Sequence, residues 1–401
     1  MVMSLKESLA MLTRGAVEVI PEKELLEKLE KSKKNNKPLR IKLGVDPSSP
    51  DIHLGHTVVL RKLKHFQDAG HQIVFIIGDF TGMIGDPSGK STTRKKLTLE
   101  EVLRNAQTYK EQAFKILDPQ KTEVRFNSEW LGKMTFSHVL ELTSHYTVAQ
   151  LLERDDFSKR YKNKSPISLV EFMYPMMQGY DSVCVKADLE LGGTDQKFNL
   201  LVGRELQREY GQEPQVIMTL PLLEGTDGVQ KMSKSLGNYI GIDEDPFEIF
   251  GKVMSISDNL MWKYYNLTTD FTPKEIEEFQ NACKNGENPK NFKLKLAQTL
   301  VELYHGKEAG QKAQMQFEEV FSKKSAIPED TPEVVLINPI NVIDLMCQYH
   351  LVSSKSEGRR MISQGAVSLE GEKINSFDFL IENQEGVLKV GKRKFLKIIK
   401  K

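Results

Sequence analysis

The sequence predicts an α/β fold built on a mainly parallel sheet. Three short, β-rich and largely apolar runs support this prediction: 39–45, 73–77 and 215–220. A helical pattern over 55–69 separates the first two runs, so they form a βαβ unit, and such buried-looking strands are typical of parallel sheets. Folds of this class bind ligands beyond the carboxyl ends of their strands, which are the loops at 44–56 and 78–94.

Helical patterns account for most of the remaining N-terminal and central sequence. Leucines spaced at i, i+4 and i+7 predict a helix over 4–32, and the polar stretch 31–38 that follows is typical of a solvated turn. Residues 99 to about 160 are mostly helical in pattern, as are residues 246–324. The run at 215–220 therefore marks the point where the sheet resumes after a helical insertion.

The C-terminal part follows a stretch that breaks helices. Pro328, Pro332 and Pro339 predict a linker. Helical patterns near 341–350 and 355–364, followed by short strands, predict a small α+β module. The expected organisation is a Rossmann-like domain at 1–240 with a helical insertion at about 115–190, a helical domain at 241–325, a linker at 326–337 and the α+β module at 338–401.

Composition excludes several protein classes. A chain of 401 residues with 39% hydrophobic and 28% charged residues is globular and has several domains. The three cysteines are far apart, so neither a disulfide framework nor a zinc ribbon is expected. No signal peptide or bilayer-spanning apolar run is evident, which predicts a cytoplasmic protein without a membrane partner. The net charge of +1 hides a basic module, because residues 338–401 carry eleven basic and seven acidic residues.

The first candidate motif is His53-Leu54-Gly55-His56, which lies where a loop enters a helix. Free amides and the dipole at a helix N-terminus favour phosphate, and the two imidazoles can donate hydrogen bonds to phosphate oxygens. Gly55 allows a ligand to approach closely. Two other interpretations remain open from this tetrapeptide: a metal-binding histidine pair, for which no third ligand is evident nearby, and an ordinary histidine pair on the surface or in the core.

The second candidate motif is Lys231-Met232-Ser233-Lys234-Ser235, in a loop flanked by glycines. Two lysines three residues apart can close onto a polyphosphate and neutralise the charge that grows during transfer. An isolated pair of this kind is more often an exposed basic loop.

A third segment, GDPSGKS at 85–91, approaches the phosphate-binding GxxxxGK[ST] pattern. Ile84 stands where that pattern requires its first glycine. The ring of amides in such a loop depends on its length, which argues against a P-loop.

Together, HLGH and KMSKS resemble the two signature motifs of class I aminoacyl-tRNA synthetases. Residues 174–181, YPMMQGYD, resemble the YPxxQxxD segment of the tyrosyl-tRNA synthetase family, and their key side chains share one helix face. The loop at 81–91 and the element Gly193-Thr194-Asp195-Gln196 also match that family. Tryptophanyl enzymes share the fold but match these segments less well. Residues 351–362 and 364–367 resemble an S4-like RNA-binding domain.

The resemblance implies an enzyme that joins tyrosine and ATP into tyrosyl-adenylate and passes the tyrosyl group to tRNA(Tyr). The implied catalytic residues are His53, His56, Lys231 and Lys234. The implied ATP-binding residues are Gly44, Asp46, His53, Gly55, His56, Asp195, Lys231, Met232, Ser233 and Lys234. The implied tyrosine-binding residues are Lys42, Thr81, Asp86, Tyr174, Gln178, Asp181 and Gln196. The implied RNA-binding residues are Arg359, Arg360, Lys392, Arg393 and Lys394.

The resemblance also assigns individual roles. Tyr174, Gln178 and Asp86 would bind the α-amino group of tyrosine, and Asp181 its hydroxyl group. Asp195 would bind the ATP ribose, and Gln196 would lie near the reacting carboxylate. Many family members have a tyrosine as a second hydroxyl ligand where this chain has Lys42, so the hydroxyl would depend mainly on Asp181, helped by water or by Lys42.

The expected partners follow from the same family. Substrate phosphates would hold Mg²⁺, with no metal bound by the protein itself. A homodimer would form through the helical insertion. Two alternatives remain: a catalytically silent, RNA-binding relative of these enzymes, and a C-terminal module that serves only folding or oligomer contacts.

Overall fold

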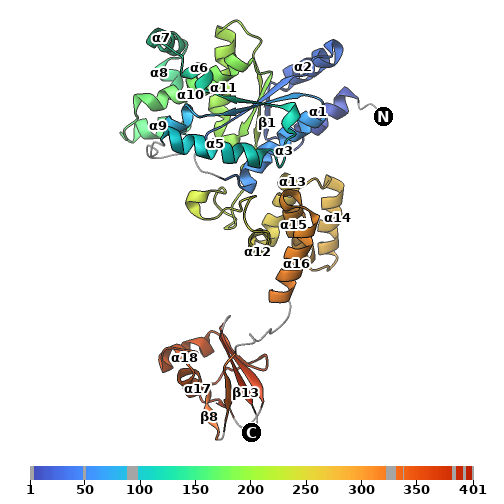
Figure 1. Ribbon diagram of the computed structural model, residues 1–401, viewed down its shortest axis with the longest axis vertical. Coiled ribbons are helices and arrows are strands. Elements are labelled where there is room, and N and C mark those ends of the chain that lie inside the picture. Colours follow the sequence, from blue (N-terminus) through green and yellow to red (C-terminus); the bar gives the residue numbers. More distant parts are fainter. Residues whose placement is uncertain are drawn as a thin grey trace. The chain divides into compact units, whose positions relative to one another are not determined.

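The computed structural model describes residues 4–47, 51–87, 98–321, 331–336, 338–381, 385–391 and 394–399. The chain divides into two units, Met1–Phe317 and Glu318–Lys401 (Figure 1). None of the described helices is both long and apolar enough to span a membrane.

A six-stranded sheet lies at the centre of the first unit, in the order β1-β6-β5-β2-β3-β4. The strands are β1 (Glu18–Ile20), β2 (Arg40–Val45), β3 (Gln72–Ile77), β4 (Thr122–Phe126), β5 (Leu189–Gly193) and β6 (Val216–Leu220). All neighbours are parallel except β1 and β6. The α/β class and the three expected strands, which are β2, β3 and β6, are confirmed.

Helices cover both faces of this sheet (Figure 1). Ile73, Phe75 and Ile77 of β3 join the large core that includes α3 (Leu54–Asp68). The alternate residues Val74 and Ile76 pack on the opposite face, beside the end of α10 (Leu169–Val185). Helix α11 (Lys197–Glu209) packs on α10. The chain leaves β2 towards β3 and later returns to β5 on the other side of β2. Ligands of doubly wound sheets bind at such a switch point.

The prediction of a single helix over 4–32 is wrong. The structure has α1 (Leu5–Thr13), then β1, then α2 (Glu22–Asn35). Gly15 has a positive φ of 77°, which ends the first helix. The expected turn at 31–38 begins later, because α2 continues to Asn35 through lysines, which are good helix formers. The helix is followed by Asn36, whose backbone has the left-handed conformation that commonly ends helices.

The helical insertion was expected at about 115–190, but in the structure it begins later, after a strand. Strand β4 lies inside that range and pairs with β3. Its sequence, TEVRF, alternates polar and apolar residues and so lacks the apolar run that identified the other strands. The helices between β4 and β5 are α6 (Ser128–Leu131), α7 (Phe136–Ser144), α8 (Val148–Leu151), α9 (Asp155–Lys162) and α10.

The remaining helices before the second unit cover the sheet or follow it, and the last of them ends just beyond Phe317. Two lie after β3: α4 (Thr81–Ile84) and α5 (Leu99–Ala113). Five follow β6: α12 (Pro246–Ser255), α13 (Asp258–Thr268), α14 (Pro273–Lys284), α15 (Pro289–His305) and α16 (Lys307–Phe321). Helix α15 packs on α12 and α13, and α13 contacts α3. The buried residues of this helical part belong to the same core as those of the sheet.

The second unit has its own apolar core beneath a five-stranded sheet of order β10-β9-β12-β13-β7. Its helices are α17 (Val342–Gln348) and α18 (Lys355–Ser363). The sheet strands are β7 (Glu333–Val335), β9 (Val367–Leu369), β10 (Glu372–Lys373), β12 (Gly386–Val390) and β13 (Lys394–Ile399), and β8 (Ile340–Asn341) pairs with β11 (Leu380–Ile381).

Candidate active site

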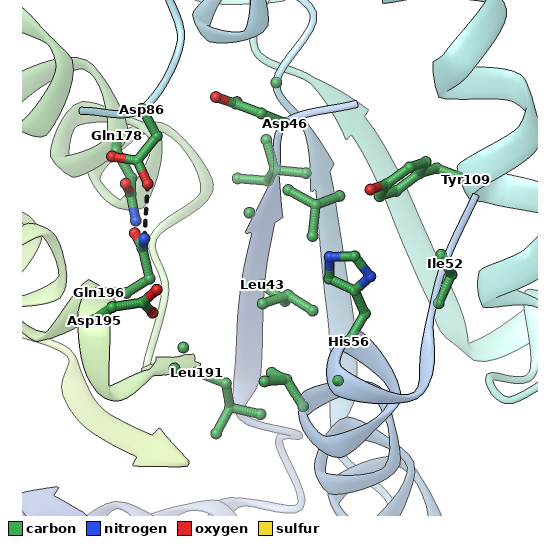
Figure 2. A pocket seen from close by; sticks show the side chains of 18 of the residues that line it. Leu43, Asp46, Ile52, His56, Asp86, Tyr109, Gln178, Leu191, Asp195 and Gln196 are labelled. Carbon is green, nitrogen blue, oxygen red and sulfur yellow. Dashed lines mark hydrogen bonds between the residues drawn. The ribbon is translucent and has the colours of Figure 1, made fainter. Parts of the chain in front are cut away.

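A cavity of about 620 Å³ opens at the carboxyl ends of β2, β3 and β5. Every residue that the sequence assigned to ATP or tyrosine lines this cavity, with the exception of Lys42. Figure 2 shows Asp86, Gln178, Asp195 and Gln196 on one wall, facing His56 on the other wall across β2. The topological switch point therefore brings together residues from distant segments of the chain.

The two histidines mark the start of α3. His53 is the residue that precedes the helix, its backbone N–H donates to Nδ1 of His56 at 3.2 Å, and the two rings stack with centroids 3.8 Å apart. Burial is the main cause that lowers the pKa of His53 to about 2 and that of His56 to about 4. Both rings are therefore neutral. Since Nδ1 of His56 accepts a hydrogen bond, its proton lies on Nε2, which can donate to a phosphate oxygen.

Gly55 packs tightly against neighbouring side chains. A Cβ atom at this position would lie 3.0 Å from the His53 imidazole and 3.5 Å from the Met232 side chain. The histidine pair and the lysine loop thus meet at this glycine. Among the described residues, no group of three His, Cys, Asp or Glu side chains could hold a metal ion.

The two loop lysines contact carboxylates at the rim of the cavity. The Lys231 ammonium lies 2.9 Å from an oxygen of Asp195, and the Lys234 ammonium pairs with Asp51. The buried Asn238 stabilises the loop, because its Oδ1 accepts a hydrogen bond from the Ser233 N–H at 2.8 Å. Phosphate oxygens would have to compete with these carboxylates for the two ammonium groups.

Asp181 lies deep in the cavity with two side-chain donors. Trp130 Nε1 donates to Oδ1 at 2.8 Å, and Asn127 Nδ2 lies 3.3 Å from Oδ2. Asp181 is 3% exposed, and burial raises the pKa of its carboxyl group to about 7, against the lowering effects of Lys42 and of the two donors. Sequence reasoning missed Trp130 and Asn127. Their position directly after β4, at the carboxyl edge of the sheet, was the signal that could have identified them.

Tyr174 and Thr81 both bind Asp46. The Tyr174 hydroxyl donates to Asp46 Oδ2 and the Thr81 hydroxyl donates to Oδ1, each at 2.7 Å. Burial and the neighbouring carboxylates raise the pKa of Tyr174, so its hydroxyl stays protonated. Asp46, which was expected to bind ATP, therefore also contacts two residues that were assigned to tyrosine.

Asp86, Gln178 and Gln196 are joined by hydrogen bonds. Gln196 Nε2 donates to Asp86 Oδ2 at 2.7 Å (Figure 2). Asn199, a buried residue that the sequence reasoning missed, donates to the side-chain oxygens of both glutamines. This wall of the cavity presents a carboxylate and amide oxygens, which suit an ammonium group.

Lys42 lies behind the cavity and does not line it. Its ammonium is fully buried, 2.8 Å from Glu190 Oε1, and it donates to Ser182 Oγ at 2.7 Å and to the Gln178 carbonyl at 2.9 Å. Lys42 and Glu190 are directly opposite each other in the pairing of β2 with β5. The structure therefore places Lys42 in an internal ion pair beside Asp181, where its charge acts on the carboxylate through space.

The raised pKa of Asp181 predicts a pH dependence of tyrosine binding. An ionised carboxylate accepts a hydrogen bond from the hydroxyl group more readily than a protonated one, so affinity should increase as the pH rises through about 7. Below that pH the dissociation constant should rise by up to about tenfold per pH unit. Equilibrium dialysis of tyrosine between pH 5.5 and 8.5 measures this change, and Asp181→Asn should remove it. A flat profile for the unmodified protein would contradict the prediction.

The predicted RNA-binding residues lie in the second unit. Arg359 and Arg360 are exposed on α18, and Arg360 lies 3.9 Å from Glu357. Lys394 begins β13, and its ammonium donates to the Leu351 carbonyl at 2.8 Å. Lys392 and Arg393 lie outside the described residues.

Comparison with known proteins identifies the family. Residues 33–322 match the model of the class I tRNA synthetases for tryptophan and tyrosine, and residues 323–398 match the C-terminal domain model of tyrosine–tRNA ligases. The tyrosine–tRNA ligase of Desulfotalea psychrophila is 56% identical, with 99% of this chain and 98% of the relative covered. That of Thermotoga maritima is 54% identical, also with 99% of this chain and 98% of the relative covered.

Solved structures agree with the sequence matches. A crystal structure of tyrosyl-tRNA synthetase with L-tyrosine from Archaeoglobus fulgidus is similar, with a TM-score of 0.63, 26% identity, and coverage of 78% of this chain and 100% of that one. The mitochondrial enzyme of Aspergillus nidulans shares the fold, with a TM-score of 0.66 at 22% identity over 80% of this chain and 95% of that one. The chain therefore belongs to the tyrosine–tRNA ligases, a family of class I aminoacyl-tRNA synthetases that use ATP as a substrate.

Proposed function

We propose that the protein activates L-tyrosine with ATP, releases pyrophosphate, and transfers the tyrosyl group from the adenylate to the terminal ribose of tRNA(Tyr). The observation that carries this proposal is the composition of one cavity. Its deep end holds the buried Asp181 with two donors, and its rim holds two neutral histidines and two lysines. This arrangement matches a substrate with a phenol at one end and a polyphosphate at the other.

The proposed chemistry requires positioning and positive charge. The tyrosine carboxylate attacks the α-phosphorus of ATP, the bond to the β-phosphate oxygen breaks, and pyrophosphate leaves. His53 and His56 donate N–H groups to phosphate oxygens, while Lys231 and Lys234 exchange their carboxylate partners for the developing negative charge. Mg²⁺ would be held mainly by the phosphates of the substrate.

Pyrophosphate exchange tests the proposed function directly. The protein should incorporate labelled pyrophosphate into ATP only when tyrosine is present among the twenty amino acids. Exchange that depends on tryptophan and not on tyrosine would identify tryptophan as the substrate. Absence of exchange with every amino acid would favour a catalytically silent RNA-binding protein.

Removing a phosphate-facing residue should reduce the rate of activation. His56→Ala or Lys231→Ala should cost about 2.7 to 4 kcal/mol of transition-state stabilisation, as the loss of a preorganised donor does. The Kd of tyrosine should stay near its normal value, because neither residue lies at the Asp181 end. Lys197→Ala serves as a matched control, since Lys197 pairs with Glu18 and does not line the cavity. Unchanged turnover in the first two variants would remove these residues from the catalytic set.

The second unit is proposed to bind tRNA through Arg359, Arg360 and the basic segment near Lys394. A double change, Arg359→Glu with Arg360→Glu, should raise the KM for tRNA and reduce its dependence on salt, because phosphate contacts release counterions. Pyrophosphate exchange in the same variant should be unchanged. Normal tRNA charging by this variant would assign the exposed arginines another role.

We also propose that the protein is a homodimer and acts in the cytoplasm, the compartment that supplies tRNA and ATP. Exposed apolar side chains on the helices between β4 and β5 support dimer formation through the insertion: Phe136, Leu140, Val148 and Leu169. Sedimentation equilibrium should give twice the mass of the chain. Phe136→Asp should shift the protein towards the monomer.

A further inference from the structure

Arg154 is a buried cation behind the amino-acid end of the cavity. It lies between α8 and α9 and is only 6% exposed. Its guanidinium lies 4.7 Å from the centroid of the Phe157 ring, and its Nε lies 2.8 Å from Asp156 Oδ1. Arg154 does not line the cavity, so it cannot be a direct ligand of the substrate.

Arg154 determines which way the Asn199 amide faces. Its Nη1 donates to Asn199 Oδ1 at 3.2 Å. A guanidinium has no acceptor, so only the oxygen of the amide can face it, and the NH₂ group must point towards the cavity wall. There it donates to Gln178 Oε1 at 3.0 Å and to Gln196 Oε1 at 3.1 Å. The guanidinium therefore favours the orientation in which the amide nitrogen of Asn199 faces the two glutamines.

Arg154 also lies close to the carboxylate of this wall. Its Nη2 is 3.8 Å from Asp86 Oδ1, while Asp86 Oδ2 accepts from Gln196. The cluster of Arg154, Asp86 and Asp156 has one positive and two negative side chains. The guanidinium is thus shared between the carboxylate of the cavity wall and that of Asp156.

We propose that Arg154 is a positioning residue that fixes the acceptors for the α-ammonium group of the substrate. It acts through Asn199 on the two glutamines and through space on Asp86. This inference rests on the proposed function, in which that wall binds the amino group of tyrosine. The hydroxyl end, with Asp181, Trp130 and Asn127, is held by separate contacts.

The separation of the two ends makes the proposal testable with three ligands. Tyrosine, desaminotyrosine, which lacks the amino group, and phenylalanine, which lacks the hydroxyl group, are measured by equilibrium dialysis. Arg154→Met should raise the dissociation constant of tyrosine roughly tenfold to a hundredfold. This is the effect of losing a residue that orients the residues in direct contact with a ligand. Desaminotyrosine should bind unchanged, and the preference for tyrosine over phenylalanine should persist. A general structural defect would weaken all three ligands together.

Two further variants complete the test. Asn199→Asp keeps a partner for Arg154 but cannot donate to the glutamines, so it should also lose the preference for tyrosine over desaminotyrosine. Arg61→Met is the matched control, because Arg61 is a buried arginine that pairs with Asp270 and does not line the cavity. This control variant should keep the preference for tyrosine over desaminotyrosine and the preference for tyrosine over phenylalanine.

The results separate this proposal from the proposed function. An unchanged ratio of tyrosine to desaminotyrosine binding in Arg154→Met and Asn199→Asp would overturn the role of Arg154, even if the unmodified protein shows tyrosine-dependent exchange. Failure of that exchange in the unmodified protein would overturn the function itself.

Discussion

Asp181→Ala should abolish most of the preference for tyrosine over phenylalanine. In the proposed complex the tyrosine hydroxyl would donate to the carboxylate of Asp181, a residue that is 3% exposed, whereas phenylalanine would cover the same carboxylate without supplying a donor. Removing a buried, hydrogen-bonded charge of this kind costs about 2 to 5 kcal/mol. For tyrosine, kcat/KM should therefore fall by roughly 30-fold to several thousandfold. For phenylalanine it should not fall and should rise, because the penalty of covering the carboxylate without a donor disappears with the carboxylate.

Asp195→Ala is the matched control for this experiment. Asp195 lines the same cavity but pairs with Lys231 at the rim. Its loss should reduce activation of both amino acids by the same factor, because neither ring reaches the rim. Equal losses for both amino acids in Asp181→Ala would show that this carboxylate does not recognise the hydroxyl group.

The sequence predicted the fold because local patterns reflect burial. Apolar runs identified β2, β3 and β6, which are covered on both faces. Strand β4 was missed because it is an edge strand, whose sequence TEVRF keeps polar residues and so has no apolar run. The break between α1 and α2 depended on the backbone of Gly15, which a leucine pattern does not show.

The cavity residues were predicted from motifs, whereas the partners that position them were not. Trp130, Asn199 and Arg154 belong to no motif. Trp130 contacts Asp181 and Arg154 lies close to Asp86, both far away in the chain, while Asn199 contacts Gln178 and Gln196. Their roles follow from how the helices pack. Lys42 shows the same limit, because its position in the sequence suggested a ligand, while the register of β2 with β5 places it against Glu190.

Lys42→Met should be among the most destabilising single changes in the N-terminal unit. It leaves Glu190, which is 1% exposed, without its cation, and an uncompensated buried charge costs about 3 to 5 kcal/mol. The shift in the urea midpoint of this unit measures the loss. The double variant Lys42→Met with Glu190→Gln should recover most of it. Lys31→Met, which breaks an exposed pair with Glu213, should cost only about 0 to 1 kcal/mol.

Substitutions at Lys42 and at Glu190 should shift the pH dependence of tyrosine binding in opposite directions. The Lys42 charge lowers the pKa of Asp181 and the Glu190 charge raises it. In Lys42→Met the carboxylate should ionise at a higher pH, so the rise in tyrosine affinity should shift upwards. In Glu190→Gln it should shift downwards. A purely structural pair would move the urea midpoint without moving the pH profile, so opposite shifts would show that the pair controls the charge of Asp181.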